Sequence, residues 1–254
     1  MSSNQQIKVY DLPTRIFHWI FAIFFSIAFY IAKEIDDDSI YFPYHMIIGL
    51  MICYIVILRG VWGICGSRYA KFSSFKLNPM DLKDYFFSLF GGKTRRDLGH
   101  NPASSYSAVA MMVVALCLAI SGILMSREVN KEFFEEVHEL FANGFFVLAI
   151  LHICGVLFHQ LKHKDGMIFS MFTGTKQNVE GSVGIQSTYK GVAVLFVGLL
   201  VAFILYVRTH YDQDKRNLNF FGVYLNLGEM YDHEEDHGVD VDSGIIEYHE
   251  NGED

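Results

Sequence analysis

The sequence predicts an all-α membrane protein in which a transmembrane four-helix bundle is followed by a fifth transmembrane helix and an acidic tail. The chain has 254 residues, of which 52% are hydrophobic, and its mean hydropathy is positive. These values are typical of an integral membrane protein. The apolar residues gather in five runs, each long enough to cross a hydrocarbon core of about 30 Å. The net charge of −8 is uneven, because Lys and Arg gather in the middle of the chain and Asp and Glu near its C-terminus.

The apolar runs and the signals that flank them predict five spans. Segment 1–14 is a polar lead, and its motif Asp11-Leu12-Pro13-Thr14 predicts a helix start with Pro13 or Thr14 in the first turn. No cleavable signal peptide is expected, because the first apolar run ends in KEIDDD without a small-residue cleavage site. The predicted spans are 15–32, 44–64, 106–126, 137–160 and 191–207.

The connections between the spans differ in character. The second and third spans are separated by a long basic loop, 66–105, in which DLKDYFFSLFGG predicts a short amphipathic helix on the membrane surface. The tail is acidic, and we expect it to be largely disordered. The chain therefore divides into a four-helix domain (8–175), a loop with the fifth transmembrane helix (176–208) and an extramembrane tail (209–254).

The distribution of Lys and Arg predicts the orientation in the membrane. Lys8, Arg15, the basic loop and the pair Lys162 and Lys164 all fall on one side of the predicted spans. Positive charge marks the cytoplasmic side. We therefore expect a cytoplasmic N-terminus, and five spans then place the acidic tail outside.

The four cysteines lie in or beside apolar runs and form no CxxC or CxxCH motif. Their spacing argues against a zinc ribbon, an iron–sulfur cluster and covalently attached haem c. We expect small buried core residues at these positions. The cysteines are Cys53, Cys65, Cys117 and Cys154.

The fourth span carries two histidines, His138 and His152, that are fourteen residues apart. At 3.6 residues per turn they share one helix face and lie about 21 Å apart along the axis. One of them is expected near each side of the bilayer. Ionisable groups inside a membrane are costly, and they are usually functional.

Two further histidines match these depths. His18 opens the first span on the cytoplasmic side, at the depth of His152, and His45 opens the second span outside, at the depth of His138. Two opposed histidines at one depth inside a helical bundle make an axial pair for haem iron. Zinc fits less well, because it takes four ligands around one centre.

Arg59 lies fourteen residues after His45, on the same helix face and at the depth of the His18 and His152 pair. An arginine at that depth needs an anion, for which a haem propionate is a natural partner. Arg15 is a second candidate for binding the cofactor. Intramembrane His and Arg also occur in non-redox transporters of metals or protons, and this is the alternative function.

The remaining histidines are less informative. His159, one heptad after His152, is open to three interpretations: a rival inner ligand, a quinone-site group or an interfacial histidine. The cluster 233–237 in the tail is either a divalent metal site or a solvated acidic run. The phenylalanines of the first and fourth spans are expected to form core and lipid contacts, and some would pack on a porphyrin. We expect solvated side chains at His100, His163, His210, His233, His237 and His249.

Several motifs together resemble the bacterial cytochrome b561 family, which includes the di-haem cytochrome b subunits of membrane-bound nickel–iron hydrogenases. The resemblance covers residues 8–175. It rests on VYDLPTRIFHW (9–19), YHMIIG (44–49), RGVWGICGSRYAKF (59–72), GHNP (99–102) and the helix with His138 and His152.

The resemblance implies two b haems in a bacterial inner membrane, with His18, His45, His138 and His152 as axial ligands. It also implies electron exchange, in a direction that the sequence leaves open, between the quinone pool and a periplasmic cytochrome c or a hydrogenase-type subunit. The chain would then be an electron-transfer subunit that oxidises quinol or reduces quinone within an oxidoreductase complex. Bis-histidine ligation fills both axial positions, which favours electron transfer over oxygen chemistry.

Overall fold

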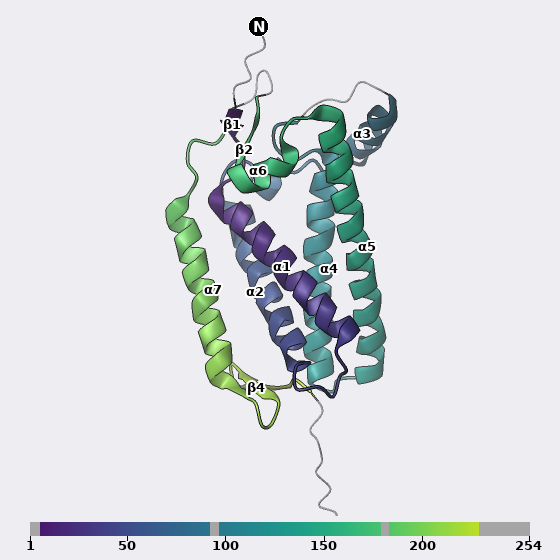
Figure 1. Ribbon diagram of the computed structural model, residues 1–254, viewed down its shortest axis with the longest axis vertical. Coiled ribbons are helices and arrows are strands. Elements are labelled where there is room, and N and C mark those ends of the chain that lie inside the picture. The colour runs from purple at the N-terminus through teal and green to yellow at the C-terminus, as the bar shows by residue number, and fades with distance from the viewer. Residues whose placement is uncertain (1–5, 92–96, 179–182, 229–254) are drawn as a thin grey trace, which may run out of the picture.

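The computed structural model describes residues 6–91, 97–178 and 183–228, most of which are helical (Figure 1). Five helices are long and apolar enough to cross a membrane, so the five predicted spans are confirmed. Each helix extends beyond its apolar run, because flanking polar residues continue the helical geometry. The five helices are α1 (Leu12–Glu34), α2 (Pro43–Cys65), α4 (Pro102–Ser126), α5 (Lys131–His163) and α7 (Lys190–His210).

Four of these helices form the bundle. Helix α1 packs on α2, α2 on α4 and α4 on α5, and ring contacts such as Phe25 with Phe145 join α1 to α5. Helix α7 packs on α1 and α2 from outside the bundle, on the side away from α5 (Figure 1). Apolar side chains on the outer faces are exposed, for example Leu151 at 62% and Ile153 at 56%. The predicted architecture of a four-helix bundle with a fifth transmembrane helix is therefore confirmed.

Buried polar side chains fix the starts of two bundle helices. Asp11 is fully buried, and its Oδ1 accepts a hydrogen bond of 2.8 Å from the backbone N–H of Thr14. Trp62 Nε1 also donates to the Asp11 carboxylate, at 3.2 Å, which ties the start of α1 to the end of α2. Asn101 caps α4 by accepting from the backbone N–H of Ser104. The predicted helix start at Asp11 is confirmed, and α4 begins four residues earlier than predicted, at Pro102.

Short elements cover the end of the bundle at which α1 begins, which we call the inner end (Figure 1). Helix α3 confirms the predicted amphipathic helix, with Tyr85 buried and Phe87 69% exposed. The antiparallel pair of β1 and β2 was not predicted, because three-residue strands carry no periodic pattern. The inner-end elements are β1 (Gln6–Lys8), η1 (Phe72–Ser74), α3 (Pro79–Gly91), α6 (Met167–Thr173) and β2 (Thr175–Gln177).

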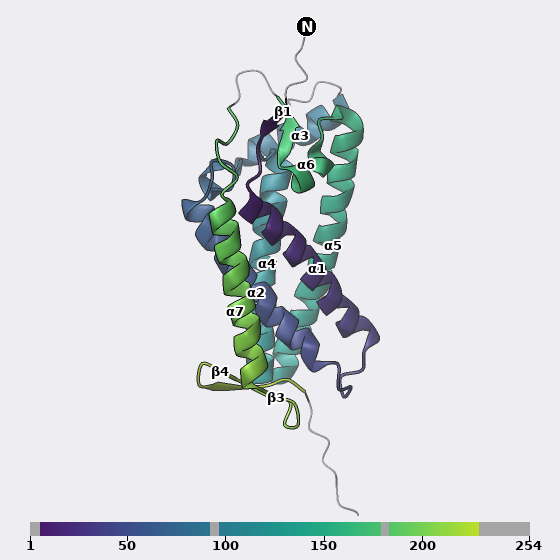
Figure 2. The ribbon, with the colours of Figure 1, turned by 60° about the vertical axis from the view of Figure 1, so that its left-hand side comes forward.

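A three-stranded antiparallel sheet closes the opposite, outer end, beside the last turn of α7 (Figure 2). Leu218, Leu225 and Leu227 are buried and pack with Phe203 and Val207 of α7. The expectation of disorder from residue 209 onward is therefore wrong up to residue 228, because this segment folds against the end of α7 rather than alone. The strands are β3 (Tyr211–Asp212), β4 (Asn217–Phe220) and β5 (Val223–Asn226). The acidic stretch 229–254, with the 233–237 cluster and His249, lies outside the described residues.

Candidate functional site

The histidines of the outer pair, His45 and His138, face each other from the first turn of α2 and from α5. Their ring centroids lie 6.1 Å apart, with an interplanar angle of 74°. His45 Nδ1 lies 2.8 Å from the carbonyl oxygen of Ala28, and His138 Nδ1 lies 2.9 Å from Ser121 Oγ. Because Nδ1 of each ring is engaged in this way, Nε2 is the nitrogen left for another partner.

The inner pair consists of His18 of α1 and His152 of α5. Their ring centroids lie 6.5 Å apart, with an interplanar angle of 58°. The indole of Trp19 packs edge-on against His18 and donates from Nε1 to the carbonyl oxygen of Met171, which anchors this part of α1 to α6. The four histidines thus lie together in the two combinations that their depths in the sequence suggest.

Both separations suit a metal ion held between two imidazoles. A metal–imidazole bond is about 2 Å long and its nitrogen lies about 1 Å from the ring centre, so two rings on one metal have centres about 6 Å apart. Small residues leave room beside the outer pair. A Cβ at Gly49, one turn after His45, would meet nothing within 4 Å, and a Cβ at Gly122 would lie 3.5 Å from the ring of His138.

An aromatic cluster separates the two pairs. Phe145 lies seven residues from both His138 and His152, so it shares their face of α5, about 10 Å from each along the axis. Its side chain is 1% exposed, and its ring centroid lies 4.2 Å from that of Phe25 and 5.7 Å from that of Phe21. The interior between the pairs is therefore apolar.

Among the described residues, the buried polar atoms at the inner end that have no hydrogen-bond partner include Arg15 Nε, Arg59 Nη1 and His100 Nδ1. Other atoms of both arginines are bound, since Arg15 Nη1 donates to the carbonyl of Phe172 and Arg59 Nη2 donates to that of Ala70 at 3.0 Å. A buried polar group left without a partner costs about 1–3 kcal/mol. Arginines with free donors in such a place suit an anion such as a carboxylate.

The expectation that His100 is solvated is wrong. Its Nδ1 is shielded from solvent, and its ring packs against those of Phe75 at 4.6 Å and Tyr10 at 5.7 Å. Burial, followed by the positive charges of Arg59 and Lys176, lowers the pKa of His100 to about 3. The histidine is therefore neutral at physiological pH in these surroundings. The feature of the sequence that could have indicated this burial is the position of His100 in the GHNP motif, immediately before a span.

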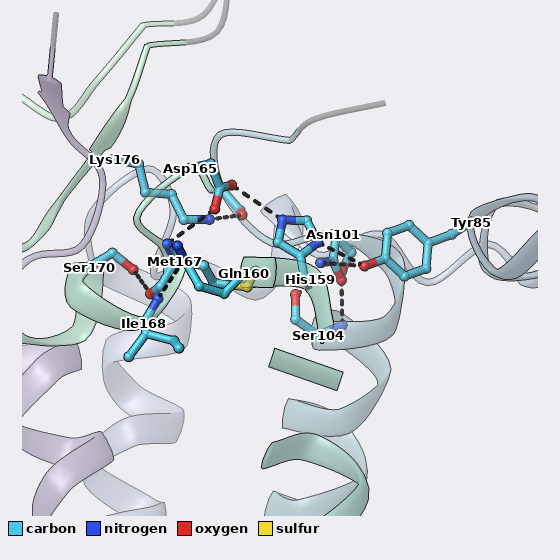
Figure 3. A network of polar contacts seen from close by, with 11 residues as sticks. Tyr85, Asn101, Ser104, His159, Gln160, Asp165, Met167, Ile168, Ser170 and Lys176 are labelled. Carbon is cyan, nitrogen blue, oxygen red and sulfur yellow. Dashed lines mark hydrogen bonds and ion pairs between the residues drawn. The ribbon is translucent and has the colours of Figure 1, made fainter. Parts of the chain in front are cut away.

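His159 belongs to a separate buried network at the inner end (Figure 3). Its side chain is 2% exposed, its Nδ1 lies 3.1 Å from the Tyr85 hydroxyl, and its Nε2 lies 3.2 Å from Asp165 Oδ2. Because both ring nitrogens are engaged, His159 does not serve as a rival inner ligand in this arrangement. The ring of His163 packs against it in a tilted arrangement, with centroids 4.5 Å apart, so His163 is not simply solvated, whereas His210 is exposed as expected.

The charges in this network fix the direction of its hydrogen bonds. Burial raises the pKa of Asp165, but the hydrogen bond from His159 and the charge of Lys176 outweigh it and bring the pKa to about 2. Burial, together with the charges of Asp97 and Asp165, raises the pKa of Tyr85 to about 12. At neutral pH the Tyr85 hydroxyl therefore donates to His159, and His159 donates to the ionised Asp165. Sequence reasoning missed this network, for which no local pattern exists.

Zinc-type coordination has no candidate among the described residues. Within 6–91, 97–178 and 183–228, no group of three or more His, Cys, Asp or Glu side chains could hold a metal ion. The intramembrane histidines meet only in twos, which suits a cofactor whose own ring supplies the remaining ligands.

Comparison with known proteins identifies the family. The model of the family described as prokaryotic cytochrome b561 matches residues 9–174, which is more than half of the chain and includes helices α1 to α6. No curated protein and no solved structure matches. The family binds b-type haem in the membrane and transfers electrons, and both histidine pairs lie within the matched residues. The chain therefore belongs to the prokaryotic cytochrome b561 family and is a membrane-embedded b-type cytochrome.

Proposed function

We propose that this chain is a di-haem cytochrome b that carries electrons across the bilayer between the quinone pool and a periplasmic redox partner. One observation carries the proposal: two facing imidazole pairs, with ring centroids 6.5 and 6.1 Å apart, at two depths of one bundle. In this scheme His18 and His152 hold the inner haem, and His45 and His138 hold the outer haem. A haem held by two histidines in this way would supply a reversible one-electron couple.

The surrounding residues orient the ligands. An outer contact to the second ring nitrogen of a metal-binding histidine fixes its tautomer and ring angle. The Ala28 carbonyl oxygen has this role for His45, and Ser121 Oγ has it for His138. Ser121 Oγ also lies within hydrogen-bond distance of the carbonyl oxygens of Cys117 and Leu118, so it can donate its own proton to one of them and accept from His138.

Arg15 and Arg59 are the proposed partners of the inner haem propionates. Support comes from the two buried arginine nitrogens, which have no hydrogen-bond partner among the residues that the structure describes. A carboxylate there would convert both into charge-assisted hydrogen bonds, which are about twice as strong as neutral ones. The apolar cluster around Phe145 would exclude water between the two haems.

We propose that the inner end faces the cytoplasm and that the sheet, with the acidic tail, faces the periplasm of a bacterial inner membrane. The basic residues of the inner end support this orientation through the positive-inside rule. A negatively charged tail outside would attract a basic partner, such as a cytochrome c or a hydrogenase-type subunit, and would speed its encounter. The alternative of a non-redox transporter is not retained, because the family transfers electrons.

The haem stoichiometry tests the proposal. A pyridine haemochrome assay on the purified protein should give two haem b per chain, and both should be low-spin in the oxidised spectrum. A single haem per chain, or a five-coordinate high-spin signal, would contradict the paired ligation.

The electron route is tested separately. A quinol added to the oxidised protein should reduce both haems in the absence of any other partner. A protein with two haems that quinol cannot reduce would retain the haem scheme and overturn the role of quinone.

A further inference from the structure

His100 and Arg59 lie near each other at the inner end and leave two buried nitrogens without a partner. His100 comes from the segment before α4, and Arg59 comes from the last two turns of α2. Within the part of the chain that the structure describes, neither His100 Nδ1 nor Arg59 Nη1 reaches solvent or a hydrogen-bond partner. Polar groups in such a place are almost always paired, so the arrangement indicates a ligand with acceptor oxygens.

The carboxylates near this place are already engaged. Asp11, whose charge acts on Arg59, accepts hydrogen bonds from Thr14, Trp62 and Ser67. Asp165 accepts from His159 and from the backbone of Met167. Neither is therefore free to serve as the missing acceptor.

The charged groups that act on His100 are both positive. Arg59 faces it from α2 and Lys176 faces it from β2, while the rings of Tyr10 and Phe75 cover its sides. Lys176 Nζ donates to the carbonyl of Gly99. Burial, followed by these two charges, keeps a proton off His100, and a bound carboxylate would offset the two charges.

We propose that His100 binds a propionate of the inner haem together with Arg59, and that it takes up a proton when that haem is reduced. This inference rests on the proposed di-haem function and adds a residue and a proton-coupling role to it. The reduction adds one electron to the iron and one proton to the imidazole of His100, so the net charge of the site does not change. The electron comes from the donor to the inner haem, and the proton comes from water at the inner end.

His100 is suited to this role by its chemistry. Arginine keeps its proton at every physiological pH, so Arg59 supplies a constant charge. Histidine is the side chain whose protonation changes between about pH 5 and 8. The propionate and the added electron both favour the protonated form of His100. The reduction potential of the inner haem should therefore fall as the pH rises.

The test is a spectroelectrochemical titration of the purified full-length holoprotein between about pH 5 and 8. The reduction potential of one haem should fall as the pH rises, by up to about 59 mV per pH unit. For one electron, this slope corresponds to a tenfold change in the equilibrium constant per pH unit. The variant His138→Ala, which should lack the outer haem, identifies the responding haem as the inner one. In His100→Gln this slope should disappear while two haems remain bound. The matched control His210→Gln, which alters an exposed histidine at the outer end, should keep the slope.

An inner-haem potential that does not depend on pH in the wild-type protein would overturn the inference. So would an unchanged slope in His100→Gln. If His100→Gln loses the inner haem, the smaller variant His100→Asn is measured with the same two outcomes. A wild-type protein without two haems would instead contradict the proposed function itself, so the two failures are distinguishable.

Discussion

The phenolic oxygen of Tyr85 in α3 lies 3.1 Å from Nδ1 of His159 in α5, although 74 residues separate them in the chain. This contact joins the amphipathic surface helix to the end of a bundle helix. Tyr85→Phe would leave a buried histidine nitrogen without a partner, at a cost of about 1–3 kcal/mol. The unfolding temperature in detergent should therefore fall by several degrees, at roughly 2–4 °C per kcal/mol.

The control for this variant is Tyr106→Phe, which removes an exposed hydrogen bond to the carbonyl of Leu77. Its unfolding temperature should stay close to that of the wild type. Equal unfolding temperatures for the two variants would show that the buried network does not stabilise the fold.

Asp165 should make the stability depend on pH in the acid range. Its pKa is about 2 in the folded chain, below the value of about 3.9 for an unfolded aspartate. A lowered pKa means that its stabilising effect is complete above about pH 4 and is lost as the pH falls toward 2. The unfolding temperature of Asp165→Asn should therefore change less over this range than that of the wild type.

The matched control is Asp84→Asn, on the exposed face of α3. Its acid profile should follow the wild-type profile. Identical profiles for Asp165→Asn and the wild type would rule out the ionised Asp165 as a source of stability.

Arg59 should set the potential of the inner haem. Reduction adds negative charge, so removal of a nearby positive charge makes it less favourable. Arg59→Leu should lower the inner-haem potential in a redox titration, and Arg59→Lys should lower it less. The outer haem should not change, because His45 is about 21 Å from Arg59 along α2. A shift in the outer haem alone would remove Arg59 from the inner site.

Ser121 should hold the outer haem indirectly, by orienting His138. Loss of such an outer contact typically weakens metal binding by about 10–100-fold. In Ser121→Ala the outer haem should be released more readily in a haem-transfer assay, while the inner haem stays bound. Ser26→Ala, which removes an exposed hydroxyl bonded within α1, is the control. Equal release from the two variants would leave Ser121 without a role at the site.

The sequence was informative where one helix sets the geometry. His138 and His152 share a face because their spacing is close to four helical turns, and the depth of each span start then paired them with His45 and His18. The five spans could be predicted from the length of the apolar runs alone. These features are local, so periodicity along the chain is enough to predict them.

The sequence was uninformative where distant segments meet. His100 is shielded by Tyr10 from the N-terminal segment, and Lys176 is buried beside Asp165 through the pairing of β1 with β2. The outer sheet buries Leu218 against α7. The composition of the segment alone does not indicate this burial. The acidic composition of the tail predicted disorder, but burial against α7 orders the segment that forms the outer sheet.

The most direct test of the paired ligation is the haem content of four single variants, His18→Ala, His152→Ala, His45→Ala and His138→Ala. Each should retain one haem per chain. His18→Ala and His152→Ala should lose the same spectral component, and His45→Ala and His138→Ala should lose the other. Loss of the same component from His18→Ala and His45→Ala, or two haems retained in any of the four, would contradict the account.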